Sequence, residues 1–101
     1  MVWVRTAVLI PKSTSTPAQR AAAFALAGSA LAGLPGLLHT QLDRVADTAV
    51  PARWQTFGIF TTIWDTQAHA NNAHTALLTT RTNPIFKAAI RRVRTVPPFQ
   101  A

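Results

Sequence analysis

Residues 53–78 read RWQTFGIFTTIWDTQAHANNAHTALL, a run typical of a strand followed by one typical of a helix. In residues 53–64, aromatic and β-branched side chains alternate over both faces, which indicates a strand covered on two sides. Asp65 then provides an N-cap for a helix over residues 66–79. In that helix Ala70, Ala73 and Leu77 recur at the spacing of one buried face. The stretch therefore predicts a strand that leads directly into a helix.

The preceding half of the chain predicts two strands around one helix. Residues 2–10 (VWVRTAVLI) are rich in β-branched side chains, and residues 37–44 (LLHTQLDR) alternate in character. Between them, residues 16–19 (TPAQ) form the pattern of a capping box, and Gly33 with the Leu34-Pro35-Gly36 turn ends the helix that follows. The buried stripe expected on this helix is Ala21, Phe24, Gly28 and Leu31.

The end of the chain predicts a third helix over residues 84–93 (PIFKAAIRRV), because Pro84 suits a first helical position. The basic run Arg91-Arg92-x-Arg94 is then a solvated helix end, and residues 95–101 form at best a brief edge strand. The order of elements predicts one α+β domain over residues 1–101, an antiparallel sheet with helices on one face. Apolar side chains on both strand faces indicate that a second copy covers the other face in a two-fold dimer.

Composition narrows the function classes. The 101 residues include ten Lys and Arg, three acidic residues, no Cys and a net charge of +7. The absence of Cys excludes a thiol nucleophile, a Cys-ligated zinc site and a disulfide scaffold. Three acidic residues argue against chemistry that needs a carboxylate pair. The basic residues are spread along the chain, so nucleic-acid binding is not expected. Residues 21–38 carry no charge, but their Ala and Gly content favours a packed helix over a membrane span.

These elements resemble the antibiotic biosynthesis monooxygenase group of the dimeric α+β barrel superfamily. The resemblance rests on the turn at residues 34–37 (LPGL), on Ile63-Trp64-Asp65, on the helix-like residues 65–78 and on residues 83–86 (NPIF). It covers about residues 2–94, and the order and spacing of these motifs carry most of it. It implies a ferredoxin-like sheet, a homodimer and a cytoplasmic enzyme that uses neither a cofactor nor a metal.

The sequence departs from the family pattern in four places. The segment between Trp64 and Pro84 is about two helical turns longer than usual. The final strand is expected to be nearly absent. Several relatives that oxidise polyketides carry Asn where this chain has Phe60, and haem-degrading relatives carry an iron-binding His where it has Ile90.

The ligand is expected between the sheet and its helices. The residues expected to line this ligand site lie on the helix-facing side of the third strand and are Gly58, Phe60, Thr62 and Trp64. Thr6 of the first strand is expected to join them. His39 is a further substrate-binding candidate, on a strand face that the sequence does not determine. Each has a structural alternative, since Trp64 also suits a core position and the threonines are common strand residues.

His69 and His74 are the candidates for proton transfer, because imidazole titrates near neutral pH. Five residues apart on a helix, they lie about 140° from one another and are not expected to share a metal. Trp64 is the third catalytic candidate, because its aromatic ring would pack against the rings of the substrate. Each histidine could also be an ordinary surface residue.

The resemblance implies cofactor-independent oxygenation of a phenol or anthrone of the polyketide type. A histidine removes a proton, and the carbanion passes an electron to O₂ in a pocket that Trp64 and Phe60 help to form. The alternatives are a non-oxidative polyketide cyclase or isomerase, and a non-enzymatic ligand- or nucleic-acid-binding protein. The expected partners are a second copy, an aromatic or polyketide substrate and an acidic carrier protein attracted by the Arg91-Arg92-x-Arg94 run. No membrane partner is expected.

Overall fold

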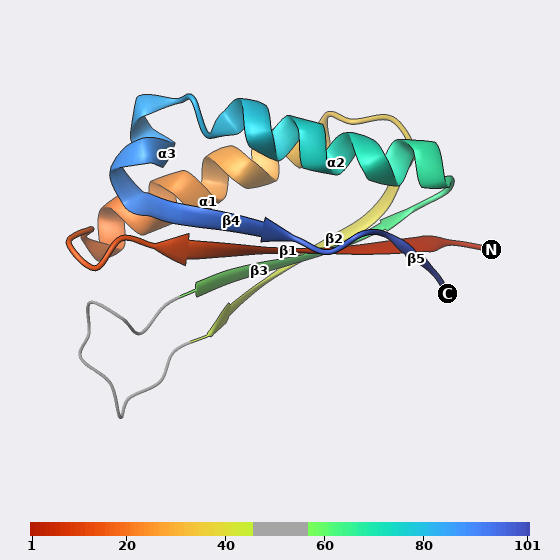
Figure 1. The fold of residues 1–101 in the computed structure, drawn as a ribbon, viewed down its shortest axis with the longest axis horizontal. Coiled ribbons are helices and arrows are strands. Elements are labelled where there is room, and N and C mark those ends of the chain that lie inside the picture. Colours follow the sequence, from red (N-terminus) through yellow and green to blue (C-terminus); the bar gives the residue numbers. More distant parts are fainter. Residues whose placement is uncertain (46–56) are drawn as a thin grey trace.

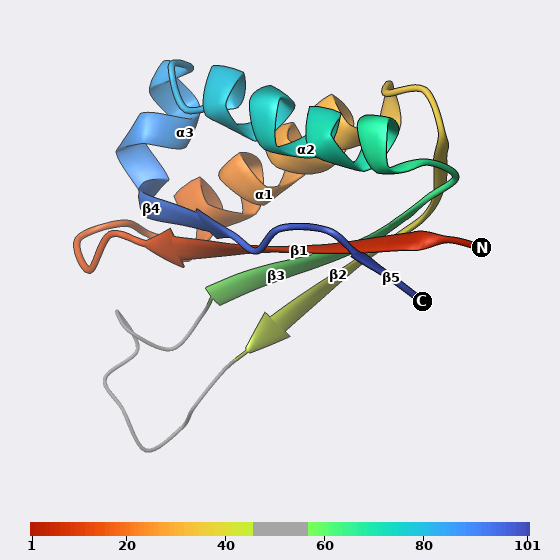
Figure 2. The same ribbon diagram turned by 45° about the vertical axis from the view of Figure 1, so that its right-hand side comes forward.

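The computed structural model describes residues 1–45 and 57–101. Its elements in chain order are β1 (Trp3–Pro11), α1 (Pro17–Ala32), β2 (Leu37–Val45), β3 (Phe57–Trp64), α2 (Gln67–Thr80), α3 (Pro84–Ala89), β4 (Ile90–Thr95) and β5 (Phe99–Gln100). The strands form one antiparallel sheet in the order β2-β3-β1-β4, and β5 also pairs with β1. All three helices lie on the same side of it (Figures 1 and 2). The predicted α+β class, with helices on one face of an antiparallel sheet, is confirmed.

The two faces of the sheet differ in burial. On β1 and β3, alternate residues are buried beneath the helices, and Arg5 stands opposite Thr62 while Ala7 stands opposite Phe60. The residues between them point the other way, so that Thr6 stands opposite Thr61. We call this second side the open face. It carries Val4, Thr6, Val8, Ile10, Ile59, Thr61 and Ile63, flanked by His39, Gln41 and Asp43 of β2 and by Arg92 and Arg94 of β4.

Helix α1 begins as the sequence predicts. Thr16 Oγ1 accepts a hydrogen bond from the Gln19 N–H, and Gln19 Oε1 accepts one from the Thr16 N–H, which completes the capping box. The predicted stripe is only partly right, because Ala21 and Gly28 are half-buried. The buried face consists of Arg20, Ala23, Phe24, Ala27 and Leu31. The helix meets β3 through Phe24, whose ring packs against Gly58, and through Gly28, which faces the Phe60 ring. Across the described residues, no helix is long and apolar enough to cross a membrane.

Helix α2 confirms its predicted stripe of Ala70, Ala73 and Leu77, but its N-cap is Thr66 rather than Asp65. The Thr66 hydroxyl accepts the His69 N–H at 3.2 Å, as an N-cap side chain does. The N-cap prediction was wrong because Asp65 and Thr66 can both cap a helix. The Asp65 carboxylate binds the His69 ring, which leaves Thr66 as the N-cap.

The C-terminal prediction was wrong in one important respect. The third helix ends at Ala89, and residues 90–95 form β4, so the final strand is present and the basic run lies on a strand. Pairing of Ile90–Thr95 with the edge of β1 outweighs the helical pattern of the local sequence. The brief edge strand expected at the end is confirmed as β5. Of the third strand predicted over residues 53–64, Phe57–Trp64 is confirmed and residues 53–56 lie outside the described residues.

Candidate functional site

Three of the residues expected to line the ligand site lie together on β3. Phe60, Thr62 and Trp64 all face the helices and are buried. The Trp64 indole N–H donates to Thr62 Oγ1 at 2.8 Å, and that hydroxyl donates to the Arg5 carbonyl oxygen at 3.1 Å. The indole and the hydroxyl are thus both satisfied inside the core. The structure supports the predicted placement of these residues on the helix-facing side, while their role in substrate binding stays a prediction.

Arg5 is the residue that the sequence-based list of candidates missed. Its side chain is buried under α2, where Nη1 donates to the Ala70 carbonyl oxygen at 3.4 Å and to Asn71 Oδ1 at 3.3 Å. Its Nε is buried and has no hydrogen-bond partner, and burial lowers the pKa of the guanidinium. Among the described residues no carboxylate pairs with it. A buried cation without an anion is costly to keep and is typical of functional sites.

His74 lies on α2 one turn after Asn71, the residue whose amide oxygen binds Arg5. Its Nδ1 is 2.6 Å from Thr95 Oγ1, and Thr95 pairs with Ala7, the next residue on the helix-facing side of β1 after Arg5. On α2, Asn71 and His74 are three residues apart and share one side of the helix. We call these residues the Arg5 site; within it Asn71 is exposed, His74 is half-buried and Arg5 is buried.

His69 occupies a different environment. Its Nδ1 is 2.6 Å from Asp65 Oδ1, and this hydrogen bond lowers the pKa of the Asp65 carboxyl. Both side chains pack against Gly36, whose backbone has a φ of 81° and whose carbonyl accepts the Asp65 N–H at 3.0 Å. The two histidines therefore point toward opposite edges of the sheet, His69 toward the turn before β2 and His74 toward β4. This agrees with the predicted separation on the helix.

Two predicted site residues lie elsewhere. Thr6 was expected to line the ligand site, but it follows Arg5 directly and therefore points to the open face, opposite Thr61. His39 is exposed and also lies on the open face. A register shift after Leu37 pairs His39 with Ile63 instead of Thr62, which turns it away from the helices. Neither residue is part of the Arg5 site.

No three His, Asp or Glu side chains of the described residues lie close enough together to hold a metal ion. The polar groups around the Arg5 site are a guanidinium, an amide, a hydroxyl and an imidazole. Together they can accept a proton and stabilise a negative charge in a partly dry environment.

Comparison with known proteins finds similar proteins among solved structures. No family model matches the sequence, and no curated protein matches it. SnoaB, a cofactor-independent oxygenase from Streptomyces nogalater, is 18% identical over 99% of this chain and 91% of its own, with a TM-score of 0.65. A dimeric ferredoxin-like protein of unknown function from Thermobifida fusca is 17% identical over 99% of this chain and 92% of its own, with a TM-score of 0.63.

A third solved structure is a proposed antibiotic biosynthesis monooxygenase from Chloroflexus aurantiacus, 16% identical over 100% of this chain and 96% of its own, with a TM-score of 0.54. Identities this low establish a shared fold and leave activity open. The chain therefore has the ferredoxin-like fold of these proteins, and its resemblance to the antibiotic biosynthesis monooxygenase group is confirmed at the level of the fold.

Proposed function

We propose that the protein is a homodimeric, cytoplasmic monooxygenase that needs no cofactor and oxidises a phenol- or anthrone-type aromatic of the polyketide class. The observation that carries the proposal is the buried Arg5 guanidinium, which has no carboxylate partner among the described residues and binds Asn71, one helical turn before His74. An aromatic substrate that becomes an anion during the reaction would provide the missing negative charge. Its charge would be stabilised by a cation that is already in place.

In this proposal His74 is the base. When its Nδ1–H donates to Thr95 Oγ1, the other ring nitrogen carries a lone pair and can accept a proton. Removal of a proton from an anthrone methylene leaves an enolate, which Arg5 stabilises. The enolate passes one electron to O₂, and the resulting radical and superoxide combine into a peroxide. The protonated His74 returns its proton to this peroxide, and loss of the second methylene proton with cleavage of the O–O bond then gives a quinone and water.

The assignment favours His74 over His69 because His74 shares its side of α2 with the Arg5 contact, Asn71. His69 is held by Asp65 at the other edge and is assigned a structural role at the turn. Trp64 and Phe60 are buried on the same side of β3 as Thr62, and in this proposal the aromatic rings of the substrate pack against them.

Oxygen uptake with an anthrone tests the proposal. We expect uptake without added flavin or metal, and a rate at least about a hundredfold lower in His74→Gln. His69→Gln is the matched control, because it removes an imidazole from the same helix and should leave uptake near the rate of the unmodified protein. A His74→Gln variant that keeps its rate while His69→Gln loses it would reverse the assignment. Absence of uptake in the unmodified protein would contradict the oxygenase.

The same base and cation would also serve a polyketide cyclase or isomerase, since that reaction begins with the same deprotonation. The anthrone assay separates the two functions when it is repeated without O₂. An oxygenase oxidises the anthrone in air and exchanges only its methylene hydrogen under argon, whereas exchange without oxidation in both atmospheres would favour the cyclase or isomerase.

The homodimer is supported by the open face. Val4, Val8, Ile59 and Ile63 form an apolar centre there, and none of the helices that the structure describes covers it (Figure 2). An apolar sheet face of this kind is normally buried, and a second copy related by a two-fold axis would bury both faces at once. Two solved structures with this fold are described as dimeric.

A further inference from the structure

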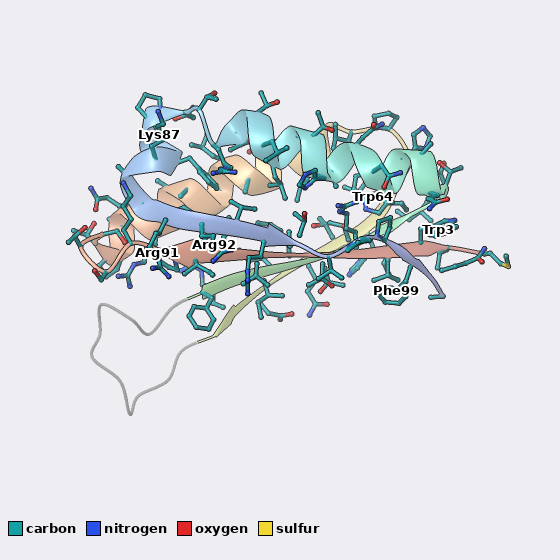
Figure 3. The ribbon with its side chains drawn as sticks, in the orientation of Figure 1. Trp3, Trp64, Lys87, Arg91, Arg92 and Phe99 are labelled. Carbon is teal, nitrogen blue, oxygen red and sulfur yellow. The ribbon has the colours of Figure 1, made fainter. Side chains whose placement is uncertain are left out.

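A second feature lies at the other end of the molecule. A pocket of about 320 Å³ is formed by the turn after β1, the end of α2, helix α3 and the start of β4. Its charged lining residues are Lys12, Arg81, Lys87, Arg91 and Arg92. Figure 3 shows Lys87, Arg91 and Arg92 gathered near α3, far along the molecule from Trp3 and Trp64. The pocket is therefore separate from the residues expected to line the ligand site.

The charged residues that line the pocket have no anionic partner in the described part of the chain. Within residues 1–45 and 57–101, none of their side chains has a hydrogen bond or ion pair, and no acidic residue lines the pocket. Asp43 binds Gln41 on β2, and Asp65 binds His69. Arg92 lines the pocket, but it pairs with Ile10 and its side chain therefore leaves β4 on the open face. The four remaining like charges around one pocket repel each other and create a positive potential that attracts an anion.

The backbone that carries Lys12 is held firmly. Its N–H donates to the Ala89 carbonyl oxygen at 2.8 Å. Its own carbonyl oxygen accepts from the Ser15 N–H at 3.1 Å, from Ser15 Oγ at 2.6 Å and from Arg20 Nη2 at 3.3 Å. The turn after β1 is thereby fixed against the junction of α3 and β4. A fixed lining binds a ligand with a smaller loss of conformational entropy.

Helix dipoles explain only part of the cluster. Lys87 lies in the last turn of α3 and Arg81 caps the end of α2, where positive charge is favourable in any protein. Lys12 lies on a turn, and Arg91 and Arg92 lie on a strand, so no helix end accounts for them. The register shift that pairs Pro11 with Ile90 and Ile10 with Arg92 leaves Arg91 as an extra residue at the pocket edge.

We propose that this pocket binds the phosphate monoester of an aromatic or apolar alcohol. A phosphate monoester carries between about one and a half and two negative charges at neutral pH and offers three acceptor oxygens, which suits several cations better than one carboxylate does. The organic part would rest on the apolar lining, which consists of Phe86, Ile90 and Val93. This proposal does not depend on the proposed oxygenase activity.

Calorimetric titration of the full chain with phenyl phosphate, inorganic phosphate and benzoate tests the three parts of the proposal. Phenyl phosphate should bind most tightly, inorganic phosphate less tightly because it lacks the ring, and benzoate least because it carries one charge. Equal affinity for benzoate and phenyl phosphate would overturn the phosphate site. Equal affinity for inorganic phosphate would overturn the ester and indicate a site for the free ion. No measurable binding of any probe would overturn the proposal altogether.

The matched variants are Lys87→Gln and Arg91→Gln against Arg94→Gln. All three residues are exposed and each change removes one positive charge, but Arg94 does not line the pocket. The two lining variants should each weaken phenyl phosphate binding about tenfold, because each loses a charge-assisted hydrogen bond. Arg94→Gln should leave the affinity unchanged. A similar loss in all three variants would mean that only the net charge of the protein attracts the anion, and it would overturn the site.

Discussion

The Thr62 hydroxyl accepts a hydrogen bond from the Trp64 indole and donates one to the Arg5 carbonyl oxygen. In Thr62→Val the indole N–H loses its partner inside the core, so we expect the free energy of unfolding to fall by about 1–3 kcal/mol. Thr61→Val is the control, because Thr61 is its neighbour on the open face and has no such role. Urea denaturation of both variants measures the difference. An equal effect in the two would contradict a structural role for the hydrogen-bond chain.

The Asp65–His69 pair makes stability depend on pH. The hydrogen bond from His69 lowers the pKa of Asp65 below its ordinary value of 3.8. A carboxyl with a lowered pKa in the folded state stabilises the fold above its ordinary pKa, and this contribution disappears as the pH falls through the lowered value. Asp65→Asn should therefore be less stable than the unmodified protein at neutral pH and equally stable in acid. Urea midpoints between neutral pH and pH about 2 test this, and a gap that is constant with pH would contradict it.

The candidate residues show when the sequence predicts which face of a strand a side chain occupies. Phe60, Thr62 and Trp64 were placed correctly because β3 is regular over these positions and alternation alone fixes their face. Thr6 was misplaced although β1 is equally regular there, because apolar residues occupy both of its faces and the pattern does not say which one meets the helices. Arg5 could have been recognised as a candidate from the sequence, because it is the one charged residue in the apolar run VWVRTAVLI.

At the scale of elements, the turn between α1 and β2 contains two glycines with different roles. Gly36 has a φ of 81°, and a Cβ there would collide with Asp65 and His69. We expect Gly36→Ala to cost at least about 1–3 kcal/mol of stability, from the backbone conformation and the collision together. Gly33 has a φ of −84° and no atom within 4 Å of an added Cβ, so Gly33→Ala should be neutral or slightly stabilising. Thermal unfolding of the two variants compares them directly, and equal losses would contradict this reading of the turn.

The elements that the sequence misjudged all depend on contacts between distant segments. Residues 90–95 carry a pattern compatible with a helix, and they form β4 because the edge of β1 is available to pair with them. The sequence left the face of His39 undetermined, and a register shift after Leu37 decides it, which alternation cannot reveal. By contrast, the capping box at Thr16 and Gln19 was predicted correctly because its contacts are local.

At the scale of the whole molecule, the fold separates two concentrations of positive charge. Arg5 is buried beneath α2, whereas the phosphate pocket collects Lys12 and Arg81 together with cations of α3 and β4. The sequence shows only the run of three arginines after residue 90, because Lys12 and Arg81 are far from it along the chain. The sheet topology brings them together by pairing β4 with β1. Part of the net charge of +7 is thus concentrated at two places, the buried Arg5 and the pocket beside α3.

The open face provides the last prediction, which concerns assembly. Ile59 pairs with Val8 at the centre of this face, and neither is fully buried in a single chain. If two sheets pack face to face, Ile59→Lys places a charge in the interface without a partner, and the dimer should dissociate. The matched control is Leu78→Lys on α2, where the leucine is 42% exposed and points away from the sheet side of the helix.

Light scattering should give twice the mass of one chain for the unmodified protein and for Leu78→Lys, and the mass of one chain for Ile59→Lys. The midpoint of thermal unfolding should rise with protein concentration only in the two dimeric proteins, because association stabilises the folded state by mass action. A single-chain mass for the unmodified protein would contradict the dimer. A dimer that persists in Ile59→Lys would mean that the chains associate through another surface.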